Sequence, residues 1–256
     1  MRSYRTAGPF PMGARAYMRA GAWYARLVYI DGRTGSIYDG GPEVAMTQEG
    51  STLNGLSLSG TTMLIGLAGG AGTSGAIESN SARWVASFAS LGLPEPISGN
   101  TRPTNIRLVT DSMDDNSVAR AGTGELFCYF GTGSSTDAGW GAGLQRHTTG
   151  TLTFRAISMI ASDLVSGVGS ITASAATAGV YVDGKINSAT SGILDLRALT
   201  NTGDFTGSVT TSSSASVTNA PPSHLVIAAT MATGNSDFRL FNPRALITFQ
   251  STNLIQ

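Results

Sequence analysis

The stretch ARLVYIDGRTGSIYD, residues 25–39, decides the fold class of this chain. Its first run, 25–30, is rich in β-branched and aromatic side chains, and a shorter run of the same kind follows at 36–38. Asp31-Gly32 stands between the two runs. An Asp-Gly pair flanked by such runs is a strong signal for a β-hairpin. The stretch therefore predicts two antiparallel strands.

Similar short runs recur along the rest of the chain, with turn residues between them. We expect strands at 106–109, 126–130, 151–157, 180–182, 193–196, 225–228, 238–241 and 246–249. The Ser- and Thr-rich stretch 206–219 is interpreted either as a flexible loop or as an edge strand. This spacing predicts a mainly β fold, a jelly-roll β-sandwich in the C-terminal part with at most one or two short helices before it.

Three regions are expected along the chain. Residues 1–24 contain two prolines and show no clean period, so they are interpreted as an extended basic arm. Residues 25–100 are expected to form a β-rich anchoring region, and residues 105–256 the jelly-roll β-sandwich. The anchoring region holds the best helix candidate, at 77–91, where large apolar side chains recur at helical spacing before Pro94.

Charged residues are scarce in this sequence. Only 32 of the 256 residues, 12%, are Asp, Glu, Lys or Arg, against roughly a quarter in an ordinary globular protein. The polar surface must then consist mainly of hydroxyl groups and backbone atoms. Such a surface is typical of a β protein whose surface is covered by neighbouring subunits. No apolar run approaches the roughly 18 residues of a membrane-spanning helix. The lone Cys128 lies in an apolar run and is expected in the core.

Arginines and aromatic residues are interleaved in the first 33 residues, where Asp31 is the single acid. Both residue types dominate binding hot spots, so this segment predicts a surface that docks on a partner. The expected docking residues are Arg2, Arg5, Arg15, Arg19, Trp23 and Arg26. Contact with nucleic acid is the alternative, but only six cations and no lysine lie in the segment, which argues against it.

Two further groups are candidate ligand sites. Asp111, Asp114 and Asp115 can supply oxygen ligands to Ca²⁺, although a solvated turn is the favoured alternative because the group lacks the register of an EF-hand. Trp140 and Tyr181 can stack on sugar rings, although burial in the core is the favoured alternative. No catalytic residue is expected, and no cofactor besides that Ca²⁺. The glycine-rich stretch at 70–75 matches a dinucleotide-binding fingerprint, but no βαβ alternation follows it.

Three segments of the second half carry a family pattern. They are GWGAGL at 139–144 with TLTF at 151–154, GVYVDGK at 179–185, and DFRLFNPRAL at 237–246. In this order they resemble the paired strands, the hallmark Asp-Gly hairpin and the closing strand of the laminin G and concanavalin-like jelly-roll family. The family's Trp-His pair ahead of the hairpin is replaced here by ASAA at 173–176. The resemblance implies a domain that binds glycans or proteins, of a kind frequent in extracellular proteins and in bacteriophage virions.

Composition and resemblance together favour a non-enzymatic virion structural protein of a bacteriophage, such as a capsid decoration, fibre or tail component. We expect it to dock through its N-terminal region and to display the β-sandwich. The expected partners are other virion proteins and copies of the chain itself, arranged as a cyclic oligomer such as a trimer. The alternative function is a lectin-like adhesion module that binds a host surface glycan. Contact with a membrane or with nucleic acid is not expected.

Overall fold

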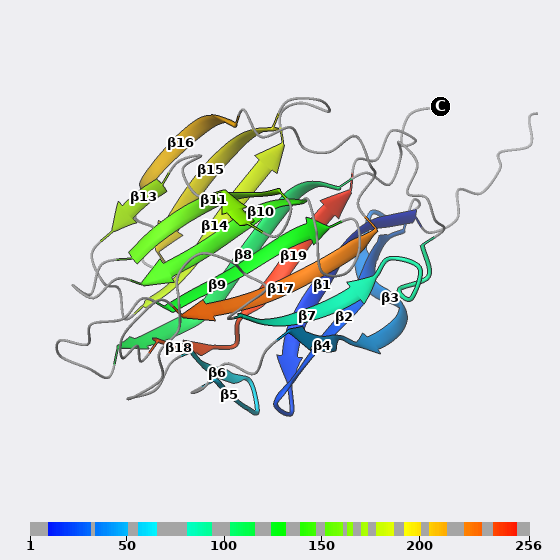
Figure 1. Cartoon of the computed structure of the whole chain (residues 1–256). Coiled ribbons are helices and arrows are strands. Elements are labelled where there is room, and N and C mark those ends of the chain that lie inside the picture. Colours follow the sequence, from blue (N-terminus) through cyan, green and yellow to red (C-terminus); the bar gives the residue numbers. More distant parts are fainter. Residues whose placement is uncertain are drawn as a thin grey trace, which may run out of the picture.

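A computed structural model describes residues 10–31, 34–50, 56–65, 81–93, 103–115, 124–131, 139–146, 152–160, 163–165, 170–173, 178–186, 192–200, 205–213, 223–231 and 238–249. These residues form two antiparallel β-sheets, which lie face to face in Figure 1. The described part of the chain contains no helix, and hence none that could cross a membrane. The chain is thus an all-β sandwich, as the sequence predicts.

Sheet A contains eleven strands. Its main path is β16 (Phe205–Ser213), β15 (Gly192–Thr200), β14 (Ala178–Ile186), β8 (Pro103–Asp115), β19 (Arg244–Phe249), β1 (Phe10–Arg19), β2 (Ala22–Ile30) and β3 (Ile37–Ala45). Off this path, β18 (Phe238–Phe241) joins β8 to β6 (Thr62–Ile65), which pairs with β5 (Leu56–Ser59). Of the two interpretations of the Thr-rich stretch, the edge strand is therefore confirmed for the described residues 206–213, because β16 ends the path.

Sheet B contains eight strands. Its path is β12 (Asp163–Val165), β11 (Leu152–Ile160), β10 (Gly139–Arg146), β9 (Gly124–Gly131), β17 (His224–Met231), β7 (Ser81–Ser87) and β4 (Thr47–Gly50), with β13 (Ser170–Ala173) also pairing with β11. Each of the eight runs that the sequence predicts as strands between 106 and 249 coincides with a strand of the two sheets, except that residue 151 lies outside the described residues.

The core lies between the sheets, where apolar side chains from both meet. Trp23 of β2 packs against Trp84 of β7 with ring centroids 6.2 Å apart, and Phe88 packs edge-on against Phe249 at 5.9 Å. Burial of each such side chain stabilises the fold by roughly 1.5–3 kcal/mol. Cys128 of β9 is fully buried, as predicted, and burial raises the pKa of its thiol.

The predicted helix at 77–91 is wrong, because its described part forms β7 followed by a turn at 88–92. The cause is burial on both faces of the strand. Trp84 faces the core cluster, and Val85, the next residue, is also only 8% exposed. A strand buried on both sides shows no alternation, and the turn that follows places Phe88 and Leu91 at spacings that imitate a helix.

The segment expected to be an extended arm forms sheet instead, from residue 10 onward. β1 pairs with β19 on one side and with β2 on the other, so it lies inside sheet A rather than ahead of the sandwich. Strands from residues 25–100 likewise belong to both sheets. The pattern was misleading because Pro11 stands beside an irregular position, where the β1–β2 register shifts between Pro11 and Gly13.

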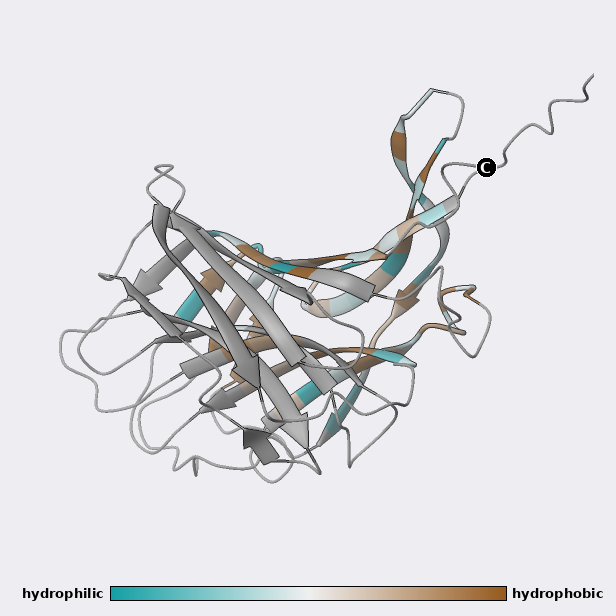
Figure 2. Cartoon of the chain, turned by 90° about the horizontal axis from the view of Figure 1, so that it is seen from above, coloured by the Kyte–Doolittle hydropathy of each residue, from teal (hydrophilic) through white to brown (hydrophobic). Residues whose placement is uncertain are grey.

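The hairpin predicted from residues 25–39 is confirmed. It joins β2 to β3, with Tyr29 opposite Tyr38 and Ile30 opposite Ile37. Figure 2 shows the tip of this hairpin extending beyond the body of the sandwich. Because β3 ends the path of sheet A, the hairpin also forms one of its edges.

Two of the three family-like segments have the expected structure. β10 pairs antiparallel with β11, and the closing segment forms β18, a short turn and β19. The expected Asp183-Gly184 turn is wrong, because both residues lie inside β14. Asp183 is opposite Arg107 of β8 and Arg197 of β15, so partner strands on both sides keep the chain extended there.

Candidate functional site

The candidate site lies on the outer face of sheet A, over β1, β2 and β3. In β1 the side chains of Ala14, Ala16 and Met18 are buried in the core. Successive residues of a strand point to opposite faces, so the residues between and after them point outward. With their neighbours from β2 and β3 they form what we call the arginine–tyrosine face: Arg15, Tyr17, Arg19, Tyr24, Arg26, Asp39 and Glu43.

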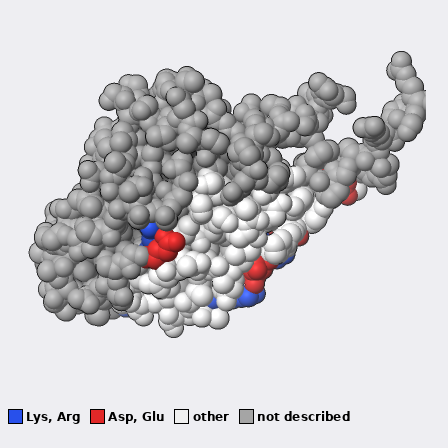
Figure 3. Space-filling view, turned by 45° about the vertical axis from the view of Figure 1, so that its right-hand side comes forward, with Lys and Arg blue, Asp and Glu red and all other residues white. Residues whose placement is uncertain are grey.

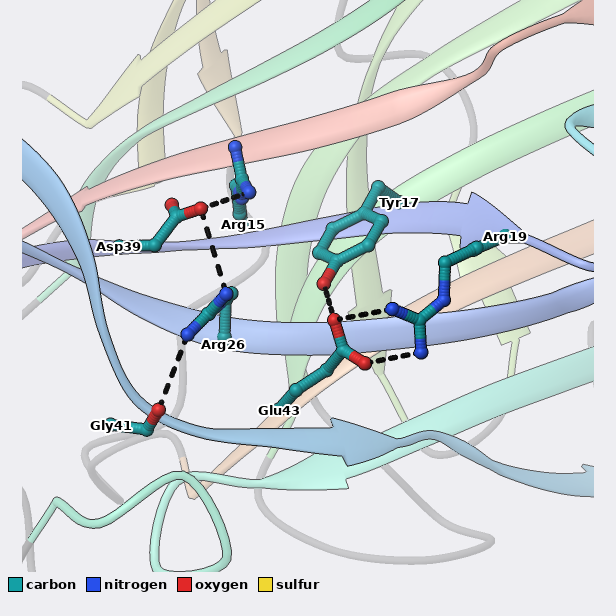
Figure 4. Close-up of polar contacts among 7 residues, drawn as sticks. All are labelled: Arg15, Tyr17, Arg19, Arg26, Asp39, Gly41 and Glu43. Carbon is teal, nitrogen blue, oxygen red and sulfur yellow. Dashed lines mark hydrogen bonds and ion pairs between the residues drawn. The ribbon is translucent and has the colours of Figure 1, made fainter.

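Two arginines of this face stand directly opposite each other, Arg15 in β1 and Arg26 in β2. Like charges at such positions destabilise a sheet. Asp39 of β3 compensates, because its Oδ2 forms ion pairs with Nη2 of Arg15 and with Nη1 of Arg26, the latter at 3.7 Å (Figure 4). One carboxylate thus holds two guanidinium groups together.

Glu43 binds one arginine and one tyrosine at the other end of the face. Arg19 donates to both of its oxygens, from Nη2 to Oε1 at 2.5 Å and from Nη1 to Oε2 at 3.3 Å, and the Tyr17 hydroxyl donates to Oε2 (Figure 4). The Tyr17 hydrogen bond, followed by the charge of Arg19, holds the pKa of Glu43 below its usual value. Partial burial and then the neighbouring Glu43 raise the pKa of Tyr17.

Aromatic contacts hold the arginines of the face in place. Tyr17 and Tyr24 stack with ring centroids 6.3 Å apart. The guanidinium carbon of Arg15 lies 4.9 Å from the centroid of Tyr17, and that of Arg19 lies 4.6 Å from the centroid of Tyr24. Each cation is attracted by the ring beneath it, so the rings help to fix the orientation of the two arginines.

A bulge in β3 lies between the two acids of the face. Ala25 is opposite Val44 and Leu27 is opposite Gly40, so three residues of β3, 41–43, stand against Arg26 alone. Gly41 has φ +70, a conformation that only glycine adopts without cost. Arg26 Nη2 lies 3.5 Å from the carbonyl oxygen of Gly41, within the bulge (Figure 4).

The structure separates the predicted docking residues into three groups. Arg15, Arg19 and Arg26 lie together on the arginine–tyrosine face. Trp23 does not belong to a docking surface, because its side chain is only 1% exposed. Along β2 buried and partly exposed side chains alternate, and Trp23 is one of the buried ones that point into the core. Arg2 and Arg5 lie outside the described residues, as does the glycine-rich stretch 70–75.

The candidate glycan residues Trp140 and Tyr181 lie on different sheets. Trp140 is in β10 of sheet B, opposite Phe130 and Ser158. Tyr181 is in β14 of sheet A, opposite Val109 and Leu199. Their role as glycan contacts remains a prediction.

The predicted Ca²⁺ ligands lie in a strand rather than in a turn. Asp111, Asp114 and Asp115 all belong to β8, whose last residues pair with β18. Asp111 accepts hydrogen bonds from Asn242 Nδ2 at 2.7 Å and from Arg244 Nη1 at 2.5 Å. In the part of the chain that the structure describes, no three metal-binding side chains gather, and Asp111 is held by a cation of the protein.

These contacts predict a pH dependence of stability. The hydrogen bond from Asn242, followed by that from Arg244, lowers the pKa of Asp111 in the folded state. Stabilisation by Asp111 is therefore present above its unfolded-state pKa, about 3.9, and is lost as the pH falls through the lower folded-state pKa. We expect Asp111→Asn to cost less than about 1 kcal/mol at neutral pH, because half-exposed ion pairs contribute little.

Chemical denaturation of both proteins at neutral pH and in acid tests this expectation. The wild type should lose more stability than Asp111→Asn between the two conditions. Parallel curves for the two proteins would mean that the Asp111–Arg244 contact contributes nothing.

Sequence reasoning did not find the acids of the face or its apolar neighbour. Asp39 directly follows the short run at 36–38, whereas β3 continues past it through the bulge to Ala45. Leu246 of β19 is opposite Arg15 and is 40% exposed. The alternation of β19, with Ala245 and Ile247 buried, is the sequence pattern that places Leu246 outward.

Comparison with known proteins identifies the fold but no sequence family. No family model matches the sequence, and no curated protein matches it. Among solved structures, the CBM2 module of the evolved Dit of Lactobacillus casei BL23 phage J-1 matches with a TM-score of 0.54 and 8% identity, covering 94% of this chain and 98% of that one. Peanut lectin matches with a TM-score of 0.44 and 13% identity, covering 79% and 90%. A legume lectin-like domain from Entamoeba histolytica matches with a TM-score of 0.41 and 12% identity, covering 78% and 88%. The chain is a jelly-roll β-sandwich, and the phage module shares this fold.

Proposed function

We propose that this protein is a non-enzymatic structural module of a bacteriophage virion, which docks through its N-terminal strands and displays a lectin-like β-sandwich. The observation that carries the proposal is the match to a module of a phage Dit protein over nearly the whole of both chains. The scarcity of charged residues supports it, because a surface poor in charge suits burial among neighbouring subunits.

The β2–β3 hairpin is the docking element in this proposal. Ile37 is 62% exposed and Tyr38 is 42% exposed, both at the start of β3. Among the described strands, β3 pairs only with β2. Pro42 and the bulge interrupt the second half of β3. Prolines and bulges on an edge strand oppose pairing with a strand of another chain. The first half has neither device and carries the two exposed apolar side chains, so it is the part suited to a neighbouring subunit.

Ile37→Lys tests the docking element. A lysine on an open edge opposes strand pairing, and the side chain it replaces is exposed, so we expect a change of less than about 0.5 kcal/mol in stability together with loss of assembly. Light scattering of the full chain measures assembly, with a closed oligomer such as a trimer expected for the wild type. Thr34→Lys, exposed in the same hairpin, is the matched control.

Mass spectrometry of purified virions of the phage that encodes the chain tests the proposal as a whole. The protein should be found in the particles, and the Ile37→Lys protein should be depleted from them. Particles that lack the wild-type protein would contradict the virion role.

Glycan binding is a second candidate function, compatible with the first. Two observations favour it: the phage module of the same fold is described as a carbohydrate-binding (CBM2) module, and the arginine–tyrosine face presents oriented hydrogen-bond donors and aromatic rings. A glycan array probed with the full chain should show saturable binding without release of sugar. An array without hits would remove this function and leave the virion role standing.

A further inference from the structure

The exposed start of β3 is a short extended stretch with a glycine at each end. Gly35 precedes the stretch and has φ +70, and Gly41 follows it and also has φ +70. A strand does not continue regularly through a left-handed residue, so the regular part of this sheet edge is limited to residues 36–40. Tyr38 stands at its centre. We call residues 36–40 the open edge.

Pairing with β2 decides which backbone groups of the open edge are available. The N–H of Asp31 donates to the carbonyl oxygen of Ser36 at 2.9 Å, so these two residues point their backbone groups toward each other. In an antiparallel pair, such residues alternate with residues whose N–H and C=O point away from the partner strand. The backbone groups of Ile37 and Asp39 therefore point away from β2, while those of Tyr38 point toward it.

The open edge is accessible to another molecule. Ile37 is 62% exposed and Tyr38 is 42% exposed, and the hairpin that carries them extends beyond the body of the sandwich (Figure 2). On the face shown in Figure 3, the described charged side chains form small clusters on a largely uncharged surface. Two copies of the chain that approach each other through such a surface meet little charge repulsion.

The open edge is complementary to a second copy of itself. Its two available residues lie one position before and one position after Tyr38. A two-fold axis through Tyr38, perpendicular to the sheet, therefore places Ile37 of each copy opposite Asp39 of the other. Every available N–H then meets an available C=O, as in a regular antiparallel ladder. The lengths match as well, because the same two glycines limit the regular stretch in both copies.

The side chains also fit this register. Tyr38 stands opposite Tyr38 of the second copy, and within its own chain it stacks on Tyr29 with ring centroids 6.0 Å apart. Cross-strand aromatic pairs stabilise a sheet. Asp39 stands opposite Ile37 of the second copy rather than opposite a like charge, and two arginines of its own chain bind its carboxylate.

The two neighbouring registers are less favourable. A two-fold axis through Asp39 places two carboxylates directly opposite each other, which destabilises a sheet, and it pairs Ile37 with the left-handed Gly41. An axis through Ile37 pairs Asp39 with Gly35, which is also left-handed. The register centred on Tyr38 is the one that pairs only extended residues.

We infer that the open edge pairs antiparallel with the open edge of a second copy, around a two-fold axis through Tyr38, so that sheet A continues from one copy into the next. The inference rests on the docking function proposed above and names its partner. A two-fold contact closes with two copies, so it selects the dimer among closed oligomers. The contact is short, so association is weak in dilute solution and stronger where a particle holds copies close together.

Disulfide trapping in the full chain tests the register. Tyr38→Cys places two thiols at directly opposite positions, where Cα atoms lie about 4.5 Å apart, within the range that a disulfide spans. Oxidation should give a covalent dimer whose yield rises with protein concentration. Ile37→Cys is the matched control. Its side chain is the more exposed of the two, but the register places it diagonally from its equivalent, so it should give severalfold less dimer. The natural Cys128 is fully buried and contributes no background.

Hydrogen exchange in the unsubstituted chain gives a second measurement, which keeps the Tyr38 ring in place. The N–H groups of Ile37 and Asp39 should exchange severalfold more slowly as the protein concentration is raised, because pairing protects the groups that were available. The N–H of Tyr38 already points toward β2, so its exchange should change little.

Three results would overturn the inference. More covalent dimer from Ile37→Cys than from Tyr38→Cys would show another register or random collision, and the docking function would stand. Assembly of the wild type without protection of Ile37 and Asp39 would show that the hairpin docks through other groups or on another protein. A chain that stays monomeric at every concentration would also overturn the inference, and the docking function would fail with it only if purified virions lack the protein.

Discussion

Trp23→Ala is expected to destabilise the protein by about 3–5 kcal/mol, the usual cost of truncating a fully buried aromatic side chain. Trp23 is 1% exposed and packs across the sandwich against Trp84 of the opposite sheet. The truncation therefore removes a contact that joins the two sheets and leaves a cavity between them. Chemical denaturation monitored by tryptophan fluorescence measures the loss, with Trp84 and Trp140 as remaining probes.

Tyr24→Ala is the matched control for this substitution. Tyr24 is the next residue in β2 and faces outward, where it stacks on Tyr17 and lies under Arg19. We expect it to cost about 0.5–1.5 kcal/mol, the value of an aromatic pair. A Trp23→Ala protein that remained as stable as the wild type but failed to assemble would restore Trp23 to the docking surface and contradict its place in the core.

Local sequence predicted the strands well, because alternation and turn chemistry are local properties. The hairpin of β2 and β3 follows from two β-favouring runs with Asp31-Gly32 between them. The closing segment follows in the same way, since Asn242, at φ +51, and Pro243 turn the chain between β18 and β19. Turn residues of this kind determine the local path whatever the rest of the chain does.

Features that depend on distant strands could not be predicted in this way. β1 lies between β19 and β2, and its pairing with a strand more than two hundred residues away has no local signature. The turn expected at Asp183-Gly184 fails for the same reason, because β8 and β15 hold the segment extended from both sides. β7 was mistaken for a helix because the layers that cover both of its faces are not visible in its own sequence.

The candidate site was predicted in part, for the same physical reason. The crowding of arginines and tyrosines in the first strands is a property of the sequence, and Arg15, Arg19 and Arg26 do form one surface. Their partners Asp39 and Glu43 come from β3, one on each side of a bulge that shifts the register by two residues relative to a regular pair. Acids and arginines 24 residues apart are brought together by tertiary pairing rather than by a motif.

Gly13→Ala is expected to be the second most damaging of these substitutions, with a loss of about 3 kcal/mol. Its Cβ would lie 1.9 Å from the carbonyl oxygen of Ile247 and 3.1 Å from the carbonyl carbon. Both are backbone atoms of β19, so no side-chain rotation relieves the clash and the strands must move apart. Overpacking of a well-packed interior typically costs 1–3 kcal/mol, and the loss here falls at the upper end because backbone pairing is disturbed as well. Thermal and chemical denaturation measure the change.

Gly60→Ala separates this steric effect from the conformational freedom of glycine. Gly60 has φ +59 and open space around it, so alanine there meets strain of about 1–2 kcal/mol but no clash. Gly13→Ala should therefore cost more than Gly60→Ala, and hydrogen exchange should accelerate at Thr248, opposite Gly13 in β19. An alanine that fits its site commonly stabilises a protein by reducing the entropy of the unfolded chain. A more stable Gly13→Ala protein would thus show that β1 does not lie against β19, and that the first residues of this chain form an arm after all.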